Sequence, residues 1–139
     1  MSTDPDCVFC KIVAGAIPCF KLHEDRATLA FMDVNPVHDG HCLVIPKAHY
    51  ATVFELPAEA FAAAGETAIR VARAVNAALA PDGLNLLQSN GPGAAQSVPH
   101  FHFHILPRRK DDGLIMNWQL RPGDRVRIAE VAERIRARL

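Results

Sequence analysis

The sequence predicts an α+β domain, and its apolar patterning supports that class. Five short segments have the patterns of strands, at 20–24, 27–32, 41–46, 84–88 and 100–106. A long helical pattern lies between the third and fourth of them, and a shorter one ends the chain. The chain has 139 residues, half of them apolar, which is enough for one ordinary domain with a hydrophobic core. We therefore expect a single domain over 1–139.

Composition excludes several classes of partner. The formal net charge is zero, so long-range attraction of nucleic acid or of an anionic membrane is not expected. The sequence holds no apolar run that approaches a membrane span of about 20 residues, and its polar, acidic start is unlike a signal peptide. We expect a cytoplasmic protein whose four cysteines are not in disulfides.

The first motif is Cys7-Val8-Phe9-Cys10. A C-x-x-C spacing is found in metal sites, in redox pairs and by chance. No βαβ pattern surrounds it, as the redox interpretation would require, and the metal interpretation needs two more ligands from elsewhere. The residues that follow, through Ala16, predict one or two helical turns that end before Pro18.

Two strands, a loop and a third strand come next. The segments 20–24 and 27–32 are separated by a predicted hairpin turn, and Asp33 ends the second. An aspartate there forms a turn or accepts hydrogen bonds from paired hydroxyls, as on a ribose. The strand 41–46 has a continuous apolar centre, and His49 follows it; alone, His49 would be assigned to the surface.

The longest helix is predicted over 58–80, because apolar residues recur at steps of three and four from Phe61 to Leu79. We interpret it as scaffold. A final helix is predicted over 124–139, and Trp118, in the irregular stretch before it, is expected to pack over the site or over a partner chain.

A Gly-rich, uncharged loop, 89–99, connects the fourth strand to the fifth. Such loops can turn backbone N–H groups toward an anion. Without a Lys-Ser/Thr ending it is not a P-loop, and it is either a plain connection or a phosphate-binding segment. Its position directly before three histidines favours phosphate binding.

Those histidines alternate with apolar residues in His100-Phe101-His102-Phe103-His104-Ile105-Leu106. Alternation over a strand places the three imidazoles on one face and the apolar side chains on the other. Imidazoles in a row can bind a metal, transfer protons or attack an electrophile. The alternative, a surface strand that happens to be rich in histidine, is less consistent with a strict period of two.

This segment resembles the signature of the histidine triad (HIT) family, His-φ-His-φ-His-φ-φ with φ apolar, at every position. Other matches occur in the family's order between Cys7 and Pro107: the Cys-x-x-Cys start, Phe31-Met32-Asp33, Leu43 to Lys47 with His49, Asn90-Gly91 and Gln96-Ser97-Val98. The chain is most similar to small bacterial zinc-containing members related to the Hint branch.

The resemblance implies a five-stranded antiparallel sheet that carries the long helix, and a homodimer with a continuous sheet. It implies a nucleotide hydrolase or transferase that cleaves nucleoside phosphoramidates, adenylylated compounds or dinucleoside polyphosphates at the α-phosphorus. His102 would be the nucleophile of a nucleotidyl-histidine intermediate, and a purine nucleotide the substrate. A backbone carbonyl of the motif would hold the other ring nitrogen of His102.

The resemblance also assigns the other site residues. His104, Asn90, Gln96 and Ser97, with the backbone N–H groups of Ser97 and Val98, would hold the phosphate. Asp33 would bind the ribose, and Phe9, Ile17, Phe31 and Val34 would line the base pocket. Cys7, Cys10, His49 and His100 would bind a structural zinc ion, since a site with four protein ligands has no open position.

One residue departs from the family pattern, and two other functions compete. The family commonly has glycine where Ala95 stands; a positive φ there would strain an alanine. A zinc hydrolase with His100, His102 and His104 as ligands would be inactivated by a chelator and form no covalent nucleotide. A purine-nucleotide-binding or scaffolding dimer with incidental activity would keep nucleotide binding after His102→Ala.

Overall fold

The computed structural model describes residues 1–115 and 120–139; Trp118 lies outside the described residues. The elements are α1 (Val8–Val13), β1 (Lys21–Glu24), β2 (Thr28–Met32), β3 (Cys42–Pro46), α2 (Ala58–Leu79), β4 (Gly83–Leu87), the 3₁₀ turn η1 (Pro92–Ala94), β5 (Phe103–Arg108) and α3 (Arg125–Arg136). In the described part of the chain no helix is long and apolar enough to cross a membrane.

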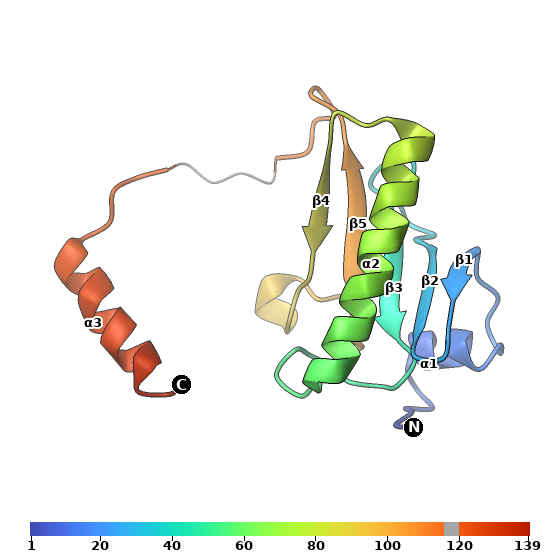
Figure 1. Cartoon of the computed structure of the whole chain (residues 1–139), viewed down its shortest axis with the longest axis horizontal. Coiled ribbons are helices and arrows are strands. Elements are labelled where there is room, and N and C mark those ends of the chain that lie inside the picture. Colours follow the sequence, from blue (N-terminus) through green and yellow to red (C-terminus); the bar gives the residue numbers. More distant parts are fainter. Residues whose placement is uncertain (116–119) are drawn as a thin grey trace.

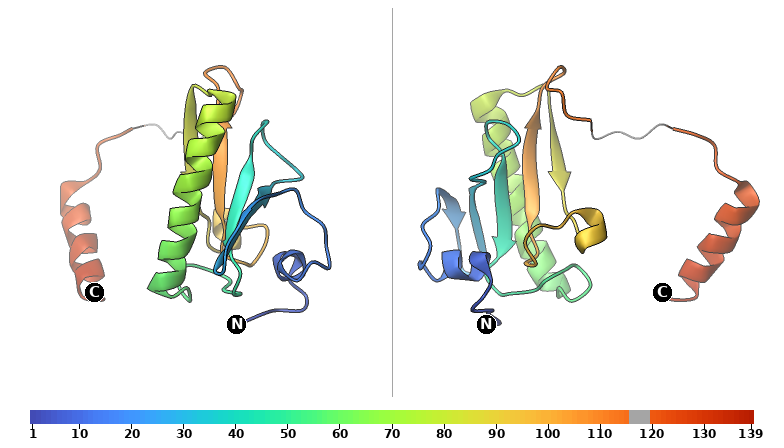
Figure 2. Two further views of the ribbon diagram at one scale, coloured as in Figure 1. Left: turned by 45° about the vertical axis from the view of Figure 1, so that its right-hand side comes forward. Right: turned by 180° about the vertical axis from the view of Figure 1, so that it is seen from behind.

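The five strands form one antiparallel sheet in the order β1-β2-β3-β5-β4, which confirms the predicted class. Helix α2 crosses one face of the sheet, and α1 lies at its other side, near the hairpin of β1 and β2 (Figures 1 and 2). The alternation of side chains along the strands gives each face its own apolar cluster. The site residues described below lie on the side of α1.

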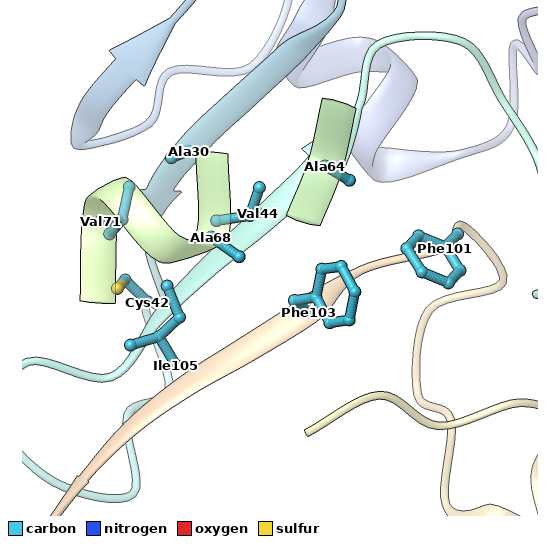
Figure 3. Packing of buried hydrophobic residues seen from close by; sticks show 9 residues of the cluster. All are labelled: Ala30, Cys42, Val44, Ala64, Ala68, Val71, Phe101, Phe103 and Ile105. Atoms are coloured by element: carbon cyan, nitrogen blue, oxygen red, sulfur yellow. The ribbon is translucent and has the colours of Figure 1, made fainter. Parts of the chain in front are cut away.

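The core under α2 is built from the predicted apolar face of the histidine segment. Phe101, Phe103 and Ile105 are buried and point toward α2, where Ala64 and Ala68 are both fully buried (Figure 3). Small residues on the helix let its backbone approach the sheet closely, so the two phenylalanine rings fill the space between them.

Helix α2 ends one residue earlier than predicted. Ala80 adopts a left-handed conformation with φ 43° and ψ 55°, and the Arg109 guanidinium donates to the carbonyls of Leu79 and Ala80 at 2.8 and 2.7 Å. The last carbonyls of a helix have no partner within it, and Arg109 supplies one.

The prediction of a strand over 100–106 is wrong at its start, because β5 begins at Phe103. The carbonyl of His100 accepts from the His102 ring, and the N–H of Phe101 donates to Tyr50 at 2.6 Å. The carbonyl of His100 and the N–H of Phe101 therefore already have partners and cannot form hydrogen bonds with β3. Of the three histidines only His104 lies in a strand, and the other two occupy the bend that leads into it.

Candidate active site and metal centre

The four predicted metal ligands lie together where α1 meets the bend before β5. Cys7 Sγ is 3.4 Å from His100 Nδ1, and Cys10 Sγ is 3.4 Å from His49 Nδ1 and 3.7 Å from His100 Nδ1. The two Nδ1 atoms are 3.3 Å apart. Zinc bonds of about 2.0–2.1 Å to nitrogen and about 2.3 Å to sulfur, in a tetrahedron, separate nitrogens by about 3.3 Å and sulfur from nitrogen by about 3.6 Å. The cluster therefore fits a tetrahedral metal ion.

In both histidines the second ring nitrogen, Nε2, faces an oxygen acceptor, as it does in metal-bound histidines. His100 Nε2 donates to the carbonyl of Pro46 at 2.8 Å, so its Nδ1 presents a lone pair to the cysteines. His49 Nε2 lies 3.9 Å from Asp4 Oδ2. Metal-bound histidines typically give their second N–H to such an acceptor. Burial lowers the pKa of His100 to about 4, which keeps the ring in the neutral form that binds metals.

A second group, Asp33, His41 and His104, also brings its ligand atoms within 4.8 Å of one another. Its surroundings do not suit a metal. The backbone N–H of Val37 donates to His41 Nδ1 at 3.1 Å. A neutral His41 therefore carries its proton on Nε2, the atom that a metal would need, and removing that proton would leave an imidazolate. This cluster is better understood as a chain of hydrogen bonds.

His102, the predicted nucleophile, is held in one tautomer. Its Nδ1 donates to the carbonyl of His100 at 2.6 Å, as expected from the family pattern, which leaves the lone pair on Nε2. The ring is only 3 % exposed, and burial lowers its pKa. A neutral ring with a free Nε2 is the form that can attack an electrophile.

His104 is held by His41, a residue to which the sequence analysis gave no role. His41 Nε2 lies 2.9 Å from His104 Nδ1, and since His41 carries its proton on Nε2, it is the donor. His104 then carries its own proton on Nε2 and can donate it to a ligand. Burial lowers the pKa of His104 to about 4, so the ring stays neutral. The rings of His104 and His102 are 4.7 Å apart between centroids.

A cavity of about 490 Å³ opens beside these rings. It is lined by all five residues predicted to bind base and ribose, and by two of the predicted phosphate-binding set: Phe9, Ile17, Phe31, Asp33 and Val34, with Ser97 and Val98. Phe9 links the cavity to the histidines, since its ring stands edge-on to His102 with centroids 5.3 Å apart. An apolar slot with a carboxylate at one side suits a planar base attached to a sugar.

The amide side chains of the loop 89–99 form hydrogen bonds with the protein's own backbone. Gln96 accepts from the N–H of Gly91 at 2.8 Å and donates to the carbonyl of Ala51 at 2.7 Å, while Asn90 accepts from the N–H of Val53 at 2.7 Å. These two predicted phosphate ligands thus brace the loop against the segment after β3. Ser97 has no hydrogen bond among the described residues, and it lines the cavity.

Ala95 is in the left-handed conformation, with φ 60° and ψ 32°. An alanine there costs about 1 kcal/mol, which glycine avoids. Ala95→Gly is therefore expected to leave the free energy of unfolding unchanged or to raise it by up to about 1 kcal/mol, measured by urea denaturation. Ala80→Gly, at the other left-handed alanine, is the matched control for stability away from the loop. A clear loss of stability in Ala95→Gly alone would contradict this account.

The chain matches the model of the HIT domain over residues 14–111. It is 39 % identical over 137 residues to an adenosine 5'-monophosphoramidase of Saccharomyces cerevisiae, covering 98 % of this chain and 84 % of that protein. It is 44 % identical over 116 residues to an adenylylsulfatase of Arabidopsis thaliana, covering 84 % of this chain but 59 % of the plant protein.

Solved structures of relatives share the fold. A HIT family member of Bacillus subtilis superposes with a TM-score of 0.90 at 39 % identity, over 96 % of this chain and 97 % of that one. A Streptococcus mutans protein gives 0.94 at 37 %, over 99 % and 87 %. A zinc-bound histidine triad protein of Mycobacterium smegmatis gives 0.75 at 35 %, over 93 % and 97 %.

Proposed function

The chain belongs to the HIT family, and we propose that it hydrolyses nucleoside phosphoramidates or related adenylylated compounds at the α-phosphorus. Relatives of about 40 % identity are an adenosine monophosphoramidase and an adenylylsulfatase, whose substrates share an adenylyl group on a leaving nitrogen or oxygen. The observation that carries the proposal is His102, a buried neutral imidazole whose Nδ1 is tied to a carbonyl and whose Nε2 lone pair is free.

The proposed reaction has two displacements at phosphorus. His102 Nε2 forms a bond to the α-phosphorus while the bond to the leaving amine breaks, and the amine departs with that electron pair and gains a proton from solvent. Water then adds to the phosphorus, its proton is lost to solvent, and the bond to Nε2 breaks, which returns the neutral ring and releases the nucleoside monophosphate. The first step uses the tautomer that the carbonyl of His100 fixes.

The remaining residues would bind and orient the substrate. His104 would donate its Nε2–H to a phosphoryl oxygen, with Ser97 and the N–H groups of the loop as further donors to developing charge. Phe9, Phe31 and Ile17 would hold the base, and Asp33 the ribose hydroxyls. We further propose a structural zinc ion at Cys7, Cys10, His49 and His100, which would fix α1, and with it Phe9, against the sheet.

The alternative of a hydrolytic zinc on His100, His102 and His104 is poorly supported by the geometry. His100 Nδ1 faces the cysteines and His102 Nδ1 faces a carbonyl. His104 Nδ1 faces His41 instead. The three rings are therefore engaged in three different directions rather than around one point.

We also propose a homodimer in which the sheet continues from one protomer to its partner through β4. Among the described residues this strand is an edge of the sheet and pairs only with β5. Leu86 on β4 and Ile69 on α2 are about half exposed, at 48 % and 52 %. An uncovered edge beside exposed apolar side chains suits pairing with a second copy.

The experiment that tests the function is release of AMP from an adenosine 5'-phosphoramidate, followed by chromatography. The wild type is expected to turn over many equivalents, and brief exposure to a chelator is expected to leave the rate unchanged. Tight binding of AMP without turnover would favour the nucleotide-binding dimer. Turnover that stops at once with chelator would favour the zinc hydrolase.

We propose His41 as a positioning residue for His104, with a test of its own. His41→Phe keeps the ring-sized volume but removes the donor to His104 Nδ1, so kcat is expected to fall by about 10²-fold with little change in KM. His41→Gln, which can donate from its amide, is expected to recover part of that loss. Equal loss in both variants with a normal melting temperature would argue against positioning through this hydrogen bond.

A further inference from the structure

The C-terminal helix, α3, lies apart from the sheet, and its apolar face is exposed. Asp124 caps α3 by accepting from the N–H groups of Val126 and Arg127, and no residue of the helix is buried. The apolar face consists of side chains at steps of three and four, namely Ile128, Val131, Ala132, Ile135 and Leu139. Figures 1 and 2 show α3 well apart from the sheet and from α2.

Two described apolar residues that precede α3 are also exposed. Ile115 and Leu120 are 88 % and 86 % exposed, and Ile128 and Ile135 on the helix are 58 % and 57 % exposed. A short helix gains most of its stability from packing its apolar face, and no residue of this helix is buried among the described residues. Exposed apolar side chains on these four described residues are typical of a surface that another molecule covers.

A largely apolar groove that could receive such a helix lies on the body of the protein, the part that contains the sheet and α2. It is a cavity of about 440 Å³ between α2 and the hairpin of β1 and β2. Most of its wall is apolar, with small and branched residues of α2 facing the strands, and His23 and Arg70 also line it: the apolar residues include Val71, Ala74, Val75 and Ala78 with Leu22 and Met32. Small alanines let the backbone of a second helix approach closely.

Charge favours contact between this helix and the body. Residues 120–139 hold six arginines and three acidic residues, a net charge of +3. Residues 1–119 hold nine basic and twelve acidic residues, a net charge of −3. Opposite net charges attract the segment to the body, and the apolar face then determines where it docks.

The position of α3 points to a second copy as the body that receives it. The helix stands away from its own groove, on the side of β4, the edge strand through which we propose that two protomers join (Figure 1). Two relatives superpose on this chain with TM-scores of 0.90 and 0.94 over 96 % and 99 % of its length, so both matches extend into α3.

We propose that the two protomers exchange their C-terminal helices, so that α3 of each docks in the groove between α2 and the β1–β2 hairpin of the other. The inference concerns assembly and does not depend on the proposed activity. Ile128, Val131 and Ile135 would enter the groove, covering Ala74 and Ala78 of the partner. The exchange buries both apolar surfaces at once and joins the two chains at a second place besides the sheet edge.

Cross-linking between two marked copies tests the exchange in the full-length protein. One copy carries Val131→Cys, at the middle of α3, and the other carries Ala74→Cys, at the middle of the groove, both in a Cys19→Ser background. Cys7, Cys10 and Cys42 are buried and remain. After the copies are mixed and equilibrated, a short bis-maleimide is expected to join one copy of each kind, as shown by intact mass.

Two controls make the outcome specific. Ile135→Gln added to the Val131→Cys copy is expected to lower the cross-linked yield at least fivefold, whereas Val126→Gln, on the opposite face of α3, leaves it unchanged. A second control carries both Val131→Cys and Ala74→Cys in one chain. When this protein is diluted into excess wild type, its cross-link to a neighbouring chain is expected to be lost. A cross-link that persists within one chain would show that α3 docks on its own body, and no cross-link in any mixture would show that the groove is not its site; either result overturns the proposal.

Discussion

His102→Ala is expected to lower kcat for an adenosine phosphoramidate by at least about 10⁴-fold while AMP still binds within about tenfold of the wild-type affinity. Loss of a covalent nucleophile removes the chemical step itself, and losses of that order or larger follow nucleophile removal in other covalent enzymes. Binding survives because the base slot around Phe9 and Phe31 does not include the ring. Steady-state kinetics and calorimetric titration with AMP give the two values.

A second histidine serves as the control for this substitution. His23 lies on β1, near one end of the sheet order, with its Nε2 3.5 Å from Asp25. His23→Ala removes the same atoms from a place outside the proposed site, and activity is expected to stay within about twofold of the wild type. If His102→Ala retained a tenth or more of the wild-type rate, another group would have to be the nucleophile.

Cys10→Ser is expected to abolish stoichiometric zinc and to lower the free energy of unfolding by at least about 4 kcal/mol. Burial raises the pKa of the Cys10 thiol, so a thiolate at this position needs a cation beside it. Without zinc the neighbouring Phe9 loses its fixed place at the cavity, and KM is expected to rise about tenfold with kcat changed much less. Metal analysis of protein purified without chelator, urea denaturation and kinetics measure the three effects.

Cys19→Ser is the matched control, since Cys19 is half-buried and lies outside the four-residue cluster. It is expected to keep one zinc per chain and to change stability by less than about 1 kcal/mol. A Cys10→Ser protein that was metal-free yet as stable and active as the wild type would contradict a structural metal at this site.

Local patterns predicted most of the fold because the spacing of apolar residues differs between helices and strands. The steps of three and four in α2 and the alternation in Phe101, Phe103 and Ile105 each specify which face is buried, and the structure buries those faces. The left-handed Ala95 stands at the position where the family commonly has glycine, and a positive φ there was considered only as a condition. Patterns of this kind depend on residues close together in the sequence.

Other features depend on contacts between distant residues. The pairing of His41 with His104 requires the register of β3 against β5, in which Leu43 faces His104. The only signal in the sequence was that His41 begins an apolar strand, and this position does not indicate which residue it pairs with. The late start of β5 has a different, local cause, since the ring of His102 takes the carbonyl of His100, two residues earlier, away from the ladder. Side-chain competition for backbone groups is not visible in an alternating pattern.

The most direct test of covalent catalysis is the intact mass of the protein after a rapid acid quench with an adenosine phosphoramidate. A transient gain of one adenylyl group is expected in the wild type and none in His102→Ala. His104→Ala, which keeps the nucleophile but loses the donor to the phosphoryl oxygen, is expected to form the adduct more slowly. Rapid turnover with no adduct at any quench time, or an adduct that persists in His102→Ala, would contradict the assignment of His102 as the nucleophile.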